Sequence, residues 1–235
     1  MGTDPLKMME VWDLPLRLFH WLLAGLVVAA YVTVELGGNF MEWHGRIGLA
    51  IMGLLVFRLA WGVVGSTHAR FASFLPTPRR LGNYLRGEWC DHGHNPLGAL
   101  SVIAMLALLL WQAVSGLFGN DDIAFNGYLY RLVSGDTSDW MTGWHKRGYW
   151  VIIALVVLHL AAIAFYRRIK KVDLITPMIT GKKQVADPEV QVPRGGGWLA
   201  FALASALAIA ITWTIGSGIL LPEPEPIPPS QQFSW

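Results

Sequence analysis

Cysteine and charge are both scarce in this sequence. Among its 235 residues there is a single cysteine, Cys90, and only 14% of the residues are Asp, Glu, Lys or Arg. One cysteine cannot form a disulfide framework or a cysteine-rich zinc or iron–sulfur site. We therefore interpret Cys90 as an incidental thiol in a loop, so any cofactor must be held by other residue types.

Hydrophobic residues, in contrast, make up 54% of the chain, and the mean hydropathy is positive. This composition is typical of integral membrane proteins and argues against a soluble domain. Five windows, each with about 20 mostly apolar residues, are long enough to cross the hydrocarbon layer: 14–34, 43–64, 96–118, 142–166 and 198–221. The first lacks a small-residue cleavage site, so we expect a true span rather than a signal peptide. The predicted fold class is an all-α integral membrane helical bundle.

The formal charge of +2 conceals a strong asymmetry between the connections. Basic residues follow the second and fourth windows: Arg70, Arg79, Arg80 and Arg86, then Arg167, Arg168, Lys170, Lys171, Lys182, Lys183 and Arg194. The other two connections are mainly acidic: Glu35 and Glu42, then Asp121, Asp122, Asp136 and Asp139 against Arg131. The positive-inside rule then predicts a cytoplasmic N-terminus and an external C-terminus, and no nucleic-acid partner is needed to explain the basic side.

Two histidines of the fourth window, His145 and His159, are fourteen positions apart. At about 100° and 1.5 Å per residue they lie roughly 40° apart around a helix and roughly 21 Å apart along it, on one stripe at two depths. Alternating helix direction places His44 at the outer level with His145, and His20 at the inner level with His159. Two histidine pairs at matched depths are what two stacked haem groups with bis-histidine ligation require. The Cys-x-x-Cys-His motif is absent, so such haems would be b-type, held by coordination and packing.

Other uses of the same histidines fit less well. A proton relay usually recruits membrane carboxylates, and no Asp or Glu lies within the five apolar cores. A zinc or copper site would gather its ligands at one depth instead of two. A lone interfacial histidine needs only a hydrogen-bonding neighbour, which is the simplest interpretation of His20 taken alone. His68, His92 and His94 lie in a polar connection and are not assigned as ligands.

Four cations accompany the histidines. Arg17 lies near the inner pair, Lys146 and Arg147 lie beside the outer pair, and Arg58 shares the stripe of His44 near the inner end of its helix. Each could neutralise a haem propionate. Contact with lipid headgroups, or snorkelling to the interface, is the alternative for all four. No catalytic residue is predicted.

The chain also resembles a known family, bacterial cytochrome b561 and the cytochrome b subunits of nickel–iron hydrogenases. The residues that carry the resemblance are Val11-Trp12-Asp13-Leu14-Pro15-Leu16-Arg17-Leu18-Phe19-His20-Trp21, Trp43-His44, Phe57-Arg58, His94-Asn95-Pro96-Leu97-Gly98, His145 and His159. The resemblance covers roughly 11–183 and implies haem b ligation by His20, His44, His145 and His159. It also implies a respiratory-chain protein of the bacterial inner membrane. Its electrons would pass between ubiquinone or menaquinone and a periplasmic c-type cytochrome or hydrogenase.

We accordingly predict a four-helix dihaem cytochrome b domain over 1–183. Residues 184–235 would form a linker, a fifth transmembrane helix and a Pro-rich periplasmic tail. In the fifth helix Ala202, Ala206 and Ala210 have a spacing that suits contact with the bundle or with another membrane subunit. The third helix has no histidine and is expected only to form a side of the bundle. The acidic connection 119–141 is either simply solvated or contacts a basic redox partner.

Two further functions stay open from the sequence. A superoxide:ubiquinone oxidoreductase would keep the haems and take electrons from a small external substrate, for which Lys146 and Arg147 are suitably basic although the surrounding aspartates oppose anion steering. A non-redox membrane anchor or transporter subunit would have no haem at all.

Overall fold

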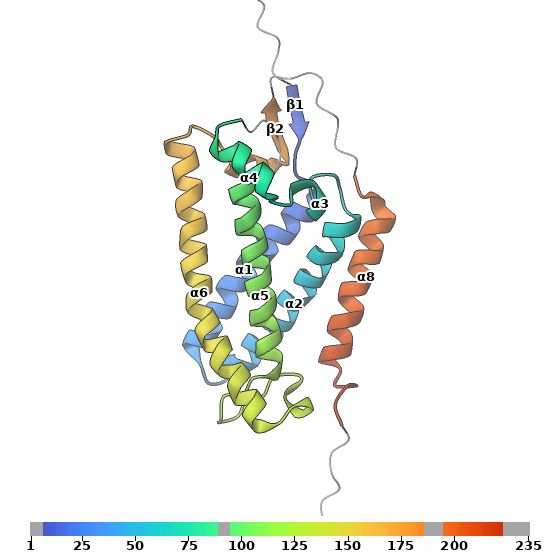
Figure 1. Ribbon diagram of the computed structural model, residues 1–235. Coiled ribbons are helices and arrows are strands. Elements are labelled where there is room, and N and C mark those ends of the chain that lie inside the picture. The colour runs from blue at the N-terminus through green and yellow to red at the C-terminus, as the bar shows by residue number, and fades with distance from the viewer. Residues whose placement is uncertain (1–6, 89–94, 186–194, 223–235) are drawn as a thin grey trace, which may run out of the picture.

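The computed structural model describes residues 7–88, 95–185 and 195–222. Within these ranges five helices are long and apolar enough to cross a membrane, and Figure 1 shows them as an elongated bundle. They are α1 (Leu14–Leu36), α2 (Phe40–Val64), α5 (Pro96–Phe118), α6 (Gly135–Arg168) and α8 (Gly197–Gly216). The predicted all-α class with five candidate spans is confirmed.

The short elements lie in the connections between the long helices. At one end, the upper end in Figure 1, the strands β1 (Lys7–Glu10) and β2 (Lys182–Val185) pair antiparallel near α3 (Phe71–Phe74) and α4 (Pro78–Leu85). The connection after α6 also contains α7 (Ile175–Thr180), and the connection between α5 and α6 contains the 3₁₀ turn Tyr130–Leu132.

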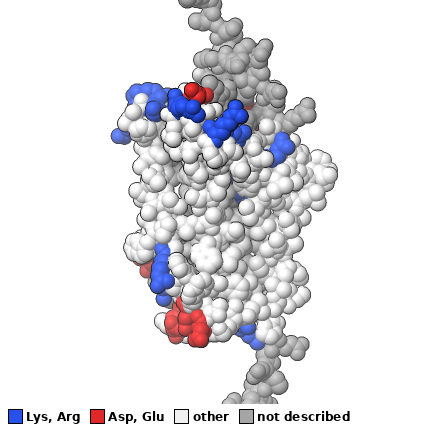
Figure 2. Space-filling view, viewed as in Figure 1, with Lys and Arg blue, Asp and Glu red and all other residues white. Residues whose placement is uncertain are grey.

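Charge distinguishes the two ends of the bundle. Figure 2 shows Lys and Arg concentrated at the end with the strands, Asp and Glu mainly at the opposite end, and few charges on the visible surface between them. We name these the basic end and the acidic end. A largely uncharged belt between two polar ends is the surface expected of a membrane-spanning bundle.

Helix α2 is the centre of the bundle, since α1, α5 and α8 all pack against it and α6 packs on α5. Its side chains Ile51, Leu55 and Trp61 are buried in a core that also contains Leu16 and Phe19 of α1. The predicted helix starts are confirmed at two places, because Asp13 accepts the Leu16 N–H and Asn95 accepts the Gly98 N–H as N-caps. Each cap satisfies a backbone donor that a helix end leaves unpaired.

The fourth span begins at Gly135, not at 142 as the hydropathy predicted. Ser134 caps it through the Thr137 N–H, and the buried Ser138 hydroxyl donates to the Phe118 carbonyl. These polar residues belong to the helix although they carry no hydrophobic signal. The connection 119–141 is therefore shorter than expected, and the fifth span also ends earlier, at Gly216 and not at 221.

The predicted stripe of the fifth helix is not the face that packs on the bundle. Ala204 and Ala208 are buried against α2, whereas Ala202 is half-buried and Ala206 and Ala210 are exposed. Gly53 of α2 lies so close that a Cβ there would be 2.9 Å from the Thr212 methyl group. Helix α8 thus packs on the bundle through small residues on a different face of the helix from Ala206 and Ala210.

The segment that follows α6 folds back onto the start of α1. The N–H groups of Val11 and Trp12 donate to the Gly181 carbonyl, and β2 continues this contact as a partner of β1. Gly181 has φ +82°, and a Cβ there would lie 2.7 Å from the Trp12 oxygen, so only glycine fits. The rest of the predicted linker, 186–194, the Pro-rich tail 223–235, Cys90, His92 and His94 lie outside the described residues.

Candidate functional site

The four histidines of the spans come together as two pairs. His44 of α2 and His145 of α6 have ring centroids 6.0 Å apart, and His20 of α1 and His159 of α6 have ring centroids 6.5 Å apart. Two nitrogens that ligate one metal ion from opposite sides lie roughly 4 Å apart, which places the ring centroids roughly 6 Å apart. The spacing within each pair therefore fits a shared metal ion.

The pair near the acidic end has oriented rings. The Nδ1 atom of His44 lies 3.0 Å from the Ala30 carbonyl, and that of His145 lies 2.9 Å from the Gln112 carbonyl. Because a carbonyl can only accept, each Nδ1 carries the proton and donates, which leaves Nε2 with its lone pair. This is the tautomer of a metal-ligating histidine with an outer hydrogen bond.

Helix α5 does more than line the bundle, because it also fixes the position of the His145 side chain. Gln112 Nε2 donates to the His145 carbonyl at 2.9 Å, and Ser115 Oγ lies 3.3 Å from His145 Nδ1. A Cβ at Gly116 would be 2.8 Å from the His145 ring, and a Cβ at Gly148 would be 2.2 Å from Gln112 Oε1. Sequence reasoning missed these residues. Their signal was a lone glutamine and glycines within apolar runs.

A cavity of about 510 Å³ opens beside this pair. Its walls come from α1, α2, α5 and α6, are mainly apolar, and include His44, His145 and Gly48. Lys146, Glu35, Tyr31 and Tyr149 also line the cavity. The two tyrosine rings stack at 5.8 Å, and the Tyr149 hydroxyl donates to Glu35. An apolar cavity of this size with a few converging polar groups is typical of a cofactor site.

The pair near the basic end is held differently. The His20 ring packs edge-to-face on Trp21 at 5.0 Å, and its buried Nδ1 has no hydrogen-bond partner among the described residues. The neighbours of His20 hold the helix to α7: Arg17 Nη1 donates to the Ile179 carbonyl and Trp21 Nε1 to the Met178 carbonyl. Nearby, Tyr166 of α6 hydrogen-bonds Tyr84 of α4, a contact that, with partial burial, raises the pKa of Tyr84 to about 12.

The predicted cations divide into two kinds. Lys146 lines the cavity beside His44 and His145, and Arg17 lies one turn from His20 with its buried Nε unpaired in the described chain. Arg58 is only 2% exposed; its guanidinium lies 4.6 Å from the Phe71 ring centroid, and its Nη1 has no described partner. Lys146 and Arg147 are both exposed, but Arg147 does not line the cavity and its guanidinium lies over the Trp144 ring.

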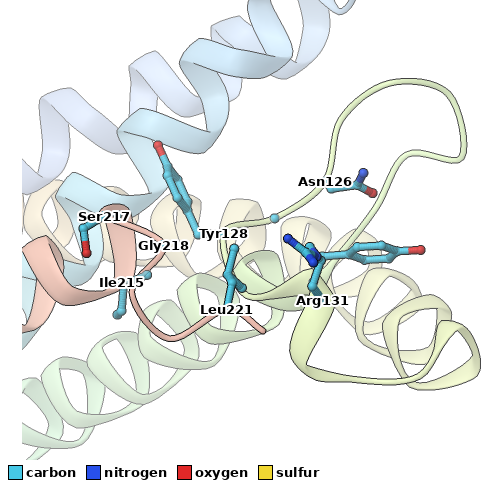
Figure 3. A pocket seen from close by; sticks show the side chains of 10 residues that line it. Asn126, Tyr128, Arg131, Ile215, Ser217, Gly218 and Leu221 are labelled. Carbon is cyan, nitrogen blue, oxygen red and sulfur yellow. The ribbon is translucent and has the colours of Figure 1, made fainter. Parts of the chain in front are cut away.

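Other potential sites lie apart from the two pairs. The His68 ring contacts Trp12, and no group of three or more His, Cys, Asp and Glu within the described ranges could hold a metal ion by itself. A second hollow of about 470 Å³ lies at the acidic end (Figure 3). One side is the loop that contains Tyr128 and Arg131, and the other is formed by Ile215 at the end of α8 and the residues up to Leu221 that follow the helix. It contains no histidine.

The chain is similar to a known family of proteins. The family model described as "Prokaryotic cytochrome b561" matches residues 11–181. A "Probable Ni/Fe-hydrogenase B-type cytochrome subunit" of Rhizobium leguminosarum bv. viciae is 24% identical over 218 residues, which cover 76% of this chain and 90% of the relative. The protein of the same description from Azotobacter vinelandii is 24% identical, with coverage of 75% and 89%.

A more distant similarity joins the chain to a "Probable Ni/Fe-hydrogenase 1 B-type cytochrome subunit" of Escherichia coli K12. It is 23% identical over 189 residues, which cover 63% of this chain and 79% of the relative. No solved structure matches the chain significantly.

The packing around His145 predicts a local sensitivity to added volume. Gly148→Ala should lower the free energy of unfolding by about 1–3 kcal/mol, because the new methyl group overlaps Gln112 Oε1 and Gln112 is tied to His145. Gly143→Ala on the same helix is the matched control, since its Cβ would be 3.8 Å from the nearest atom, Arg147 Nη1. Thermal unfolding in detergent measures both; equal melting temperatures would contradict the contact.

Proposed function

Since the chain belongs to the prokaryotic cytochrome b561 family, a family of membrane b-type cytochromes that transfer electrons, we propose that it is a dihaem carrier between the quinone pool and a periplasmic redox partner. The family implies haem b as the cofactor. The observation that carries the dihaem proposal is the presence of two histidine pairs, each with the ring separation that one shared iron requires.

In this proposal His44 and His145 ligate the haem near the acidic end, and His20 and His159 ligate the haem near the basic end. Bound haem b would supply one-electron chemistry, which no side chain of the protein provides. The residues themselves orient and exclude water. The carbonyls of Ala30 and Gln112 fix the ring tautomers, Gly116 makes room for the His145 ring, and the apolar walls keep the site dry.

The buried cations support the same assignment. Arg17 Nε and Arg58 Nη1 are buried donors without a described partner, and a carboxylate is the acceptor that a guanidinium pairs with most strongly. We therefore assign Arg17 and Arg58 to propionates at the basic-end haem and Lys146 to those at the acidic-end haem. Arg147, whose guanidinium lies over the Trp144 ring in this structure, is proposed as a further partner of the acidic-end propionates.

Haem content tests the proposal directly. Pyridine haemochrome analysis of the purified protein should give two haems b per chain. His44→Ala and His145→Ala should each remove one and the same spectral haem, while His20→Ala and His159→Ala remove the other, because each iron would lose one of its two histidine ligands. His68→Ala should keep both. Colourless protein from haem-replete cells would instead favour a non-redox anchor.

We further propose that the basic end lies in the cytoplasm of a bacterial inner membrane, with the chain's C-terminus in the periplasm. The positive-inside rule and the charge separation of Figure 2 support this orientation. It would place the His20 and His159 pair near the cytoplasmic face and the cavity with His44 and His145 near the periplasmic face.

Reporter fusions measure the orientation. Alkaline phosphatase fused after Gly87 should be inactive, because that connection is cytoplasmic in this proposal, and the same enzyme fused after Asp122 or after the last residue should be active. A fluorescent protein that matures only in the cytoplasm should give the opposite pattern. Activity of the phosphatase at Gly87 would reverse the assigned direction.

The partner is proposed from the names of the relatives, which are cytochrome subunits of Ni/Fe-hydrogenases. When the tagged protein is purified from native membranes, hydrogenase subunits should copurify with it. Hydrogen gas should then reduce its haems. His145→Ala should retain the partner but lose reduction of the acidic-end haem. Recovery of a c-type cytochrome, with no response to hydrogen, would select the other partner class. Prompt reduction by superoxide alone would favour the superoxide:ubiquinone alternative.

A further inference from the structure

The two histidine pairs differ in how their rings are positioned. His44 and His145 each have a ring hydrogen bond to a backbone carbonyl, but the buried Nδ1 of His20 has none within the described chain. The direction of the His20 ring therefore depends on the position of α1 itself. Whatever fixes the rotation and height of α1 at this end also fixes His20 relative to His159.

Asp13 is the residue that joins α1 to its neighbour at this end. Its Oδ1 accepts the Leu16 N–H at 2.7 Å as the N-cap of α1, and its Oδ2 accepts the Trp61 Nε1–H of α2 at 3.0 Å. His20 is seven residues further along α1. Seven residues correspond to about 700°, so the two lie roughly 20° apart around the helix and roughly 10 Å apart along it. Asp13 and His20 therefore lie on the same face of α1.

Trp61, which donates the hydrogen bond to Asp13, is held firmly by its own neighbours. Trp61 is 2% exposed and stacks on Phe57 at 5.9 Å, and Phe201 of α8 packs edge-to-face on it. One carboxylate thus caps α1 and accepts a hydrogen bond from the indole of α2.

We propose that Asp13 is a positioning residue for the basic-end haem: through its hydrogen bond from Trp61 it sets the rotation of α1 that orients His20. This inference rests on the proposed dihaem function. A role confined to helix capping would weaken α1 without singling out one of the two haems.

The test uses the full-length haem-loaded protein and two variants. Asp13→Ser retains a good N-cap but loses the carboxylate and the reach to Trp61, whereas Trp61→Phe removes only the indole donor and keeps an aromatic ring. Thr77→Ala, which removes the N-cap of α4 at its Arg80 N–H, is the control for loss of capping alone. The readouts are the low-spin ferric haem signals in electron paramagnetic resonance and the midpoint potential of each haem.

Both Asp13→Ser and Trp61→Phe should shift the signal of the haem that His20→Ala removes and leave the other signal in place. In both variants the midpoint potential of that haem should shift together with its signal, while the potential of the other haem stays unchanged. Thr77→Ala should change neither signal.

Equal shifts of both haems, or unchanged signals in Trp61→Phe, would overturn the inference. If Asp13→Ser does not fold, Trp61→Phe still decides, since it keeps the cap and the charge. Pyridine haemochrome analysis separates this failure from failure of the proposed function: fewer than two haems in the unsubstituted protein removes the dihaem proposal. If the unsubstituted protein has two haems and the signals are unchanged in the variants, only the proposed role of Asp13 is excluded.

Discussion

A polar ring placed between apolar helices must find a partner, and this constraint organises the bundle. Unpaired polar groups are strongly unfavourable in hydrocarbon, so each histidine of the spans needs a hydrogen bond, a metal ion or both. Backbone carbonyls of α1 and α5 meet this need for His44 and His145 on the side of the ring away from the pair. The two rings of each pair lie 6.0 and 6.5 Å apart between their centroids, and this is where the proposed haem iron would be held.

The same constraint explains the roles of the helices. Helix α6 supplies one histidine to each pair, and α2 and α1 supply the facing residues at the two levels. Helix α5 supplies no ligand, yet its carbonyl at Gln112 and its glycine at position 116 determine where the His145 ring lies. A helix without ligands can therefore be as important to the site as one that carries them.

Periodicity and the cost of polar groups in lipid were sufficient to predict the spans, the helix starts at 14 and 96, and the two levels at which the histidines lie. They could not predict the start of α6, since Gly135 to Ser138 join the helix through a serine cap and not through hydrophobicity. Nor could they choose between alanine stripes on α8, because an evenly apolar helix has no preferred face. The supports of His145 and the pairing of β1 with β2 depend on residues distant in sequence, which local patterns do not reveal.

The contrast between α2 and α6 has a consequence for biogenesis. In their apolar windows 39% of α2 is buried but only 6% of α6, and α6 has few direct contacts with α1. Helix α6 is held mainly by α5, and a ligand bound between α6 and α1 would add the attachment that direct packing between these two helices lacks. By mass action, cofactor supply would then favour the position of α6 against α1, so maturation of the bundle and delivery of its prosthetic groups would be thermodynamically coupled.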